Sequence, residues 1–193
     1  MISGLRAVIG SMKRRIWQSD VSVVYSLPLE PLAAERPDDI SFIGLNGLLN
    51  EQEDKAIALP EPYESFRQQG DSGLVAFVHS EIAGWMWIRK GPFLEGVGFG
   101  TAEIPAGVNV VRHVEVYPAF RSKGVGRSLL TEGGRRFRLR TRNHAIAFVN
   151  CRNTASIKAF DAAGYIVEGR IRFHEILGRP LKVVIRPDKH FKS

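Results

Sequence analysis

The sequence predicts an α/β fold of the α+β kind, in which one mixed β-sheet of about six to seven strands carries helices on both faces. Its 193 residues suffice for one hydrophobic core and are too few for two comfortable domains. Hydrophobic residues make up 44% and charged residues 24%, which is typical of globular proteins. Runs with strand spacing and runs with helix spacing follow one another, and no internal repeat is visible.

The domain organisation follows from where these runs begin. Residues 1–20 hold a short apolar patch and a basic cluster without a clear periodic pattern, so we expect an N-terminal extension there. Residues 21–193 are expected to form a single domain.

The first half of the chain holds the weakest element signals. An apolar, β-branched run at 21–29 predicts a strand that ends at prolines. Helical spacing at 38–50 and 61–69 predicts one or two short helices. The elements expected next are strands at 74–78 and 82–88 around a tight turn, a glycine-rich loop at 91–107, and a strand at 108–117 that ends at Pro118.

The second half alternates more clearly. A helix is predicted at 124–140, with Leu129, Leu130 and Phe137 toward the core. The elements expected after it are a short strand at 145–149, a helix from Asn153 to Gly164, and strands at 166–173 and 181–185.

Charge and cysteine content restrict the classes of function. The net charge is +7, and many arginines fall at 135–142, where no aromatic residues alternate with them for base stacking. We therefore expect an exposed helix face and no nucleic-acid partner. Cys151 is the only cysteine, which excludes an intramolecular disulfide and favours a cytoplasmic protein. No stretch approaches the ~20 apolar residues of a transmembrane helix.

The segment 114–127 predicts a phosphate-binding loop. A strand end, a loop of the form Arg121-x-x-Gly124-x-Gly126 and a helix start follow in immediate succession. The glycines let the backbone approach a ligand, and the free amides and dipole of the helix start attract an anion such as a pyrophosphate. The spacing differs from a dinucleotide fingerprint, and no Gly-Lys-Ser or Gly-Lys-Thr completes an NTPase loop.

This loop resembles the acetyl-CoA loop of the GNAT superfamily of N-acetyltransferases, in its pattern Pro118-x-x-Arg121-x-x-Gly124-x-Gly126. A second motif of that superfamily follows a strand downstream: Asn153-x-x-Ser156, a helix, and Gly164-Tyr165. The resemblance covers residues 74–175 and implies a sheet that splays into a V after the strand ending at Tyr117.

The resemblance also implies acetyl-CoA as co-substrate, with no metal ion. The pantetheine arm would lie along the strand at 114–116, and Asn153 would bind it from the opposite wall, although a plain helix cap is an alternative role. The cofactor-binding residues implied are Val114, Val116, Arg121, Ser122, Lys123, Gly124, Val125, Gly126, Arg127, Asn153, Ser156 and Phe160.

The catalytic residues are less clearly marked. Phe160 occupies the position where many superfamily members carry a tyrosine that protonates the thiolate, and Tyr117 and Tyr165 are the nearby phenols. For the base, His113 and Glu115 share one face of the strand if no bulge separates them, with Glu115 the first choice. Ordinary exposed cross-strand pairs are the alternative for both.

Three functions remain open at this stage. The first is transfer of an acetyl group from acetyl-CoA to an amine of a small molecule or peptide, by direct attack in a ternary complex. The second is a catalytically weak acyl-CoA-binding or regulatory module, because Phe160 cannot donate a proton. The third is a docking role for the basic extension. A homodimer is possible, and the acceptor is not fixed by the motifs.

Overall fold

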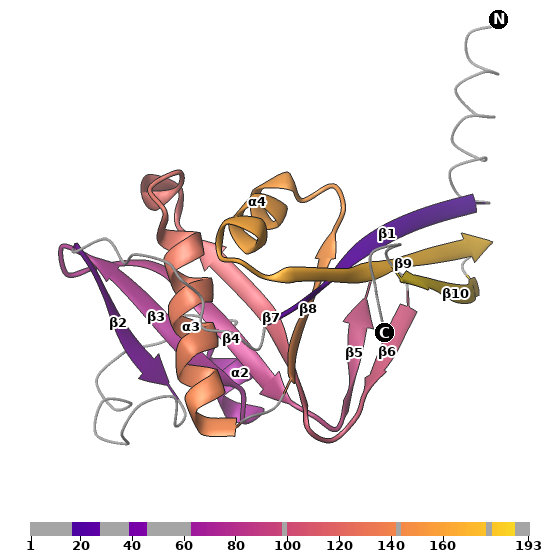
Figure 1. The fold of residues 1–193 in the computed structure, drawn as a ribbon, viewed down its shortest axis with the longest axis horizontal. Coiled ribbons are helices and arrows are strands. Elements are labelled where there is room, and N and C mark those ends of the chain that lie inside the picture. Colours follow the sequence, from indigo (N-terminus) through magenta and orange to yellow (C-terminus); the bar gives the residue numbers. More distant parts are fainter. Residues whose placement is uncertain are drawn as a thin grey trace, which may run out of the picture.

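A computed structural model describes residues 17–27, 39–45, 63–97, 100–141, 144–176 and 179–187. Within these residues, eight strands form one mixed sheet in the order β10-β9-β1-β8-β7-β4-β3-β2, and β5 and β6 form a separate hairpin (Figure 1). The elements in chain order are β1 (Trp17–Ser26), β2 (Ile40–Leu45), α2 (Tyr63–Gln68), β3 (Ser72–Val78), β4 (Glu81–Lys90), β5 (Phe93–Val97), β6 (Gly100–Ile104), β7 (Val108–Val116), η1 (Pro118–Phe120), α3 (Val125–Thr141), β8 (His144–Asn150), α4 (Thr154–Ala162), β9 (Ile166–Ile176) and β10 (Arg179–Pro187).

The two faces of the sheet are covered by different elements. Helices α3 and α4 pack on one face, where Leu129 and Leu130 are fully buried as predicted. Helix α2 covers the other face of β3 and β4, and the β5–β6 hairpin packs near β1, β8 and β9 (Figure 1). Alternation along β1 shows both layers, because Tyr25 faces the helices and Val24 the hairpin. The predicted fold class is confirmed.

The sheet opens between its two central parallel strands. β7 and β8 pair only from Val108 with His144 to Val111 with Ala147. Beyond these pairs, the rest of β7 stays on β4 while the end of β8 stays on β1. The V implied by the resemblance is therefore present, and it begins within β7, earlier than expected.

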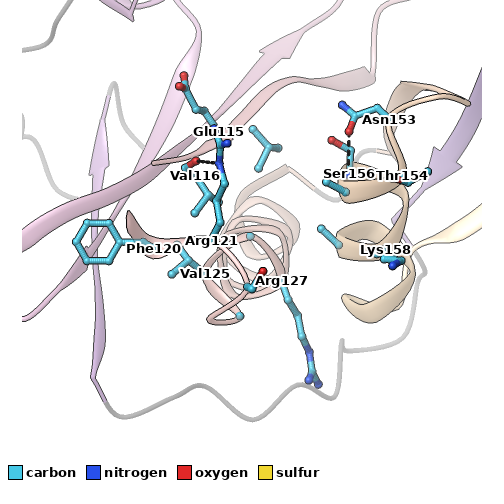
Figure 2. A pocket seen from close by; sticks show the side chains of 16 residues that line it. Glu115, Val116, Phe120, Arg121, Val125, Arg127, Asn153, Thr154, Ser156 and Lys158 are labelled. Atoms are coloured by element: carbon cyan, nitrogen blue, oxygen red, sulfur yellow. Dashed lines mark hydrogen bonds between the residues drawn. The ribbon is translucent and has the colours of Figure 1, made fainter. Parts of the chain in front are cut away.

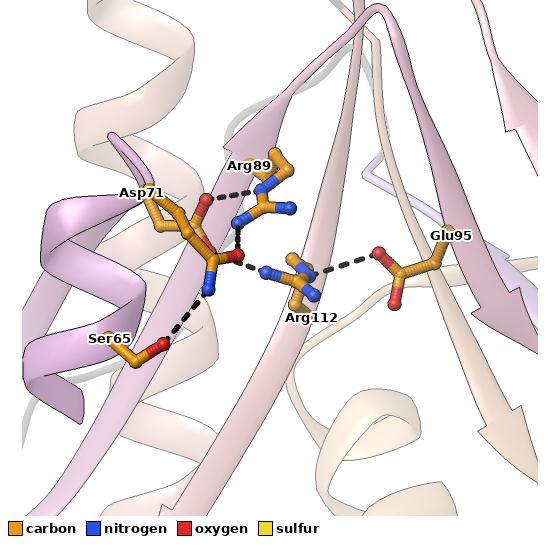
Figure 3. Close-up of polar contacts among 6 residues, drawn as sticks. Ser65, Asp71, Arg89, Glu95 and Arg112 are labelled. Carbon is orange, nitrogen blue, oxygen red and sulfur yellow. Dashed lines mark hydrogen bonds and ion pairs between the residues drawn. The ribbon is translucent and has the colours of Figure 1, made fainter. Parts of the chain in front are cut away.

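A β-bulge at Arg112 changes which way the end of β7 faces. Ile88 of β4 lies opposite Val111, whereas Trp87 lies opposite His113, so Arg112 is the extra residue. Arg112 donates to the fully buried Asp71 at 2.8 Å and to Glu95 at 3.0 Å, as Figure 3 shows. These two carboxylates hold the bulged residue in place.

The bulge precedes both catalytic candidates, so His113 and Glu115 still share one face of β7 as predicted. From His113 onward β7 pairs regularly, with His113 opposite Trp87 and Glu115 opposite Trp85. Residues directly opposite in an antiparallel pair share a face. Both candidates therefore face the α2 side, while Val114 and Val116 face α3 and α4.

Two predicted elements were wrong. The helix expected at 38–50 is strand β2 at its described residues, where Ile40 and Phe42 are buried and Ser41 between them is exposed. The loop expected at 91–107 contains the β5–β6 hairpin, whose Val97 and Ile104 are buried.

The boundaries of most other elements agree closely with prediction, and helix α2 lies within the segment predicted at 61–69. Strand β1 is the exception: it spans Trp17–Ser26, so it begins inside the predicted extension and before the strand expected at 21–29. Residues 1–16, 28–38, 46–62 and 188–193 lie outside the described residues, so most of the expected extension and the remainder of the helix predicted at 38–50 are not covered. Among the helices described, none is long and apolar enough to span a membrane.

Candidate functional site

A pocket of about 780 Å³ lies where the sheet opens, between the end of β7, the start of α3 and the first turns of α4 (Figure 2). Its lining combines a strand edge, a loop and two helix starts. The lining residues are Val114, Glu115, Val116, Phe120, Arg121, Ser122, Gly124, Val125, Gly126, Arg127, Asn153, Thr154, Ala155, Ser156, Lys158 and Ala159.

The loop between β7 and α3 places main-chain amides without helical partners beside this pocket. Ser122 and Gly124 have φ angles of 61° and 81°, which turn the chain sharply before the helix begins. The first helical hydrogen bond of α3 runs from Ser128 N–H to the Gly124 carbonyl, so the preceding amides have no partner within the helix. This arrangement suits a phosphorylated ligand.

Arg121 fixes the same loop to the strand. Its Nε donates to the Val116 carbonyl at 3.0 Å, which Figure 2 shows as a dashed line. Arg121 is exposed and lines the pocket, so its guanidinium adds positive charge beside the loop amides.

The edge of β7 that faces the pocket carries unpaired main-chain groups. The Tyr117 amide donates to Ala83 of β4, so the main-chain groups of Val114 and Val116, which alternate with it, point away from β4 into the opening. The Val116 carbonyl accepts from Arg121 Nε there, and the two N–H groups and the Val114 carbonyl remain open to a ligand. No described strand pairs with this part of β7 on that side. An extended ligand can therefore be hydrogen-bonded there as an additional strand.

Helix α4 supplies the second wall. The Asn153 side chain caps the helix, because its Oδ1 accepts a hydrogen bond from the Ser156 amide at 3.1 Å. Its Nδ2 makes no hydrogen bond to the other described residues, and Asn153 itself lines the pocket (Figure 2). The cap and a ligand contact are thus geometrically compatible.

The pocket also passes a steric test for a narrow ligand. A Cβ atom added at Gly126 would lie 3.5 Å from Val116 Cγ2 and 3.7 Å from Ala159 Cβ. These are ordinary contact distances, so an alanine would fit at this position without a clash. Glycine therefore leaves a methyl-sized space open between the two walls. Arg127 and Lys158 line the same pocket and are exposed. The gap and its charge fit an extended anionic molecule.

Most residues predicted for the cofactor line this pocket, and two do not. Lys123 lies outside it, with its ammonium group 5.6 Å from the centre of the Phe120 ring. Phe160, expected beside the channel, is 4% exposed and stacks on Tyr25 in the core at 5.0 Å. Sequence reasoning missed Phe120 and four α4 residues; helical spacing from Ser156 is a signal for Ala159. The α4 residues missed are Thr154, Ala155, Lys158 and Ala159.

The two catalytic candidates lie together beside the pocket. His113 Nε2 is 3.3 Å from Glu115 Oε2, and the same oxygen accepts a hydrogen bond from the Tyr63 hydroxyl of α2. The Tyr63 hydrogen bond, followed by that of His113, holds the pKa of Glu115 below its ordinary value against the opposing effect of burial. Tyr63 was not singled out from the sequence, which offers no signal for a contact across 52 residues.

The remaining phenols face away from the pocket. The Tyr165 hydroxyl donates to the Leu130 carbonyl at 3.3 Å and is buried in the core. The Tyr117 hydroxyl accepts from Trp85 Nε1 at 2.9 Å on the α2 side. Trp85 and Trp87 are fully buried under Tyr63, so they serve as core on this face.

The fold and the site together define an α/β protein with a pocket between two parted strands, and the lining of this pocket suits an extended, phosphorylated ligand. The chain belongs to the acetyltransferase (GNAT) family, which matches it over residues 43–165. A search among curated proteins finds no match.

Solved structures with the same fold share little sequence with this chain. A functionally unknown conserved protein from Staphylococcus epidermidis has a TM-score of 0.56 at 16% identity, covering 87% of this chain and 65% of that one. A GCN5-related N-acetyltransferase from Sphaerobacter thermophilus has a TM-score of 0.54 at 16% identity, covering 89% and 56%. A GNAT-family acetyltransferase from Colwellia psychrerythraea has a TM-score of 0.56 at 14% identity, covering 83% and 57%. This chain therefore spans less than two thirds of the length of each.

Proposed function

We propose that this chain transfers the acetyl group of acetyl-CoA to an amine of a small molecule or peptide, by direct attack in a ternary complex. The observation that carries the proposal is the pocket at the parting of β7 and β8, which gathers the loop amides, the free strand edge and Asn153. Membership of an acetyltransferase family supports the same reaction.

In this proposal each wall of the pocket binds one part of acetyl-CoA. The amides from Gly124 to Arg127 bind the pyrophosphate, with positive charge from Arg121. The pantetheine arm lies along Val114 and Val116, and the Asn153 amide group donates to it from the other side. The gap at Gly126 lets the arm pass between the walls.

The chemical step needs a neutral amine beside the thioester carbonyl. The amine nitrogen forms a bond to the carbonyl carbon, the carbon–sulfur bond breaks, and the electron pair leaves with the sulfur. A main-chain amide near Val116 stabilises the oxygen that becomes negative. Glu115 takes the proton that the amine loses, directly or through water. The thiolate takes its proton from water, because no phenol lines the pocket among the described residues.

A catalytically weak acyl-CoA-binding module is the second candidate. One observation favours it: Phe160 is buried in the core. Many members of the GNAT superfamily carry a proton-donating tyrosine at this position, and phenylalanine cannot donate a proton. Binding is common to both candidates, so turnover separates them.

The test is calorimetric titration of the protein with acetyl-CoA, followed by thiol release against a panel of amines, amino acids and peptides. We expect binding and acceptor-dependent thiol release, and we expect Gly126→Ala to weaken binding because its methyl group fills the gap. Gly96→Ala is the matched control, since nothing lies within 4 Å of its added Cβ and it is remote in the hairpin. Binding without thiol release would select the second candidate, and no binding by the unmodified protein would refute both.

A further inference from the structure

We propose that Tyr63 is a positioning residue that holds the Glu115 carboxylate with one oxygen anchored and the other free to accept the proton of the incoming amine. This inference rests on the proposed function and assigns to α2 a part in the reaction that neither motif suggests.

The Tyr63 ring is fixed in place by the sheet. It is 4% exposed and stacks on Trp85, with ring centres 4.9 Å apart and planes inclined by 18°. It is also nearly parallel to the Trp87 ring, at 6.4 Å and 10°. Both tryptophans are fully buried, so they form a rigid floor. The hydroxyl group is thereby aimed at one point, the Glu115 carboxylate.

The two carboxylate oxygens of Glu115 have different surroundings. Oε2 accepts the Tyr63 hydrogen bond and lies 3.3 Å from His113 Nε2. Oε1 has no partner among the described residues, and the Glu115 side chain is 38% exposed beside the pocket. An anchored carboxylate with one open oxygen is the arrangement that a proton acceptor needs, because its geometry is set before the substrate arrives.

The charged and titratable groups around Glu115 come from three elements. Tyr63 approaches from α2, His113 from β7, and Arg121 from the loop after β7. The hydrogen bond from Tyr63 is the strongest influence that lowers the pKa of Glu115, while burial raises it. Burial and the same hydrogen bond raise the pKa of Tyr63, so the phenol keeps its proton at neutral pH.

The direction of the effect of Tyr63 follows from these contacts. Removing the hydroxyl removes the strongest influence that favours the ionised carboxylate, so the pKa of Glu115 rises in Tyr63→Phe. The ionised fraction then falls at mildly acidic pH. The rate of acyl transfer should fall with it there, and recover as the pH increases.

The experiment measures the carboxylate and the reaction separately. Protein labelled with ¹³C at glutamate carboxyl carbons is titrated by NMR, with Glu115→Gln identifying the signal of Glu115. The pH dependence of kcat is measured by thiol release with the best amine of the panel. Tyr25→Phe is the matched control, because the Tyr25 hydroxyl donates to Asp161 at 2.8 Å and its ring stacks on Phe160, remote from Glu115.

We expect the Glu115 midpoint and the acidic limb of kcat to move to higher pH together in Tyr63→Phe, with acetyl-CoA affinity unchanged, and neither to move in Tyr25→Phe. In the Glu115→Gln background, Tyr63→Phe should cause no further loss of rate. An unmoved NMR midpoint, or a rate lowered equally at every pH, would overturn the proposal. Failure of the proposed function differs from either result, because the unmodified protein would then release no thiol although Glu115 still titrates as expected.

Discussion

Asn153 combines an observed structural role with a proposed binding role. Its Oδ1 caps α4, and the proposed function assigns its amide group to the pantetheine arm. Asn153→Ser keeps a capping oxygen and loses the amide donor, so it should retain stability and bind acetyl-CoA more weakly. Asn153→Ala should lower the free energy of unfolding by about 1 kcal/mol as well. Urea unfolding and calorimetric titration measure the two effects.

If Asn153→Ser binds acetyl-CoA as tightly as the unmodified chain, Asn153 is a helix cap alone. Ser122, at the opposite wall, offers no such separation, because its φ angle of 61° makes any substitution a test of the backbone as well.

At the scale of single residues, a site residue can be predicted from the sequence when its contacts are to neighbours along the chain. Gly124, Gly126 and Asn153 were predicted because their roles follow from a few consecutive residues that form a turn or a helix start. Tyr63 was not, because its partner lies on a strand brought beside it only by the sheet. Phe160 lies in the core because Tyr25 of β1 stacks on it, a contact that no local pattern indicates.

At the scale of elements, helix α3 carries an acid-sensitive ion cluster. Glu132 accepts hydrogen bonds from Arg135 at 2.8 and 2.9 Å and also pairs with Arg136. These contacts, that of Arg135 first, lower the pKa of Glu132 to about 2. A carboxylate with a pKa lowered by folding stabilises the fold above the unfolded value of 4.5, and this contribution is lost as the pH falls from 4.5 toward 2.

Glu132→Gln should therefore destabilise the protein at neutral pH by about 2 kcal/mol, less than the full shift implies because Arg135 is largely exposed to screening solvent. The deficit relative to the unmodified chain should shrink as the pH falls through this range, as measured by urea unfolding at pH 7, 4.5 and 3. Glu81→Gln is the control, since Glu81 is exposed and forms no ion pair with the other described residues. A deficit that does not change with pH would contradict the assignment.

The two wrong elements have related causes. The apolar residues of 38–50 also satisfy a helical spacing, and pairing of Ile40–Leu45 with β3 decides for a strand. In 91–107 the frequent glycines indicate a loop, yet Phe93–Val97 and Gly100–Ile104 pair and bury Val97 and Ile104. Tertiary packing overrides local preference in both cases.

At the scale of the whole molecule, the two halves of the sheet are joined by few strand-pairing interactions. Direct strand pairing between its halves is limited to Val108–Val111 of β7 with His144–Ala147 of β8 among the described residues. A ligand that contacts both walls of the pocket adds interactions between these two halves and stabilises the folded state. Acetyl-CoA should raise the melting temperature, with a gain of about 2.7 kcal/mol at a concentration 100 times Kd.

Thermal unfolding followed by fluorescence at increasing acetyl-CoA concentrations measures this gain, and Gly126→Ala at the same concentrations should show a smaller rise. An equal rise in both proteins would place the ligand outside the opening.

The V-shaped opening of the sheet was predicted only through the resemblance. Two neighbouring strands part when each pairs with a different strand on its other side, and no local sequence pattern indicates this.

The alternation of side chains along the end of β7 separates the residues that would contact the acyl donor from those on the side of the proposed base. Val114 and Val116 face the pocket side, whereas His113 and Glu115 face α2. In the proposed reaction, substitutions of α2 residues other than Tyr63 can alter the choice of acceptor while Glu115, Tyr63 and the even-numbered positions of β7 stay constant. A lineage, or a laboratory library restricted to those α2 positions, can thus diversify acceptors without rebuilding the site for the acyl donor.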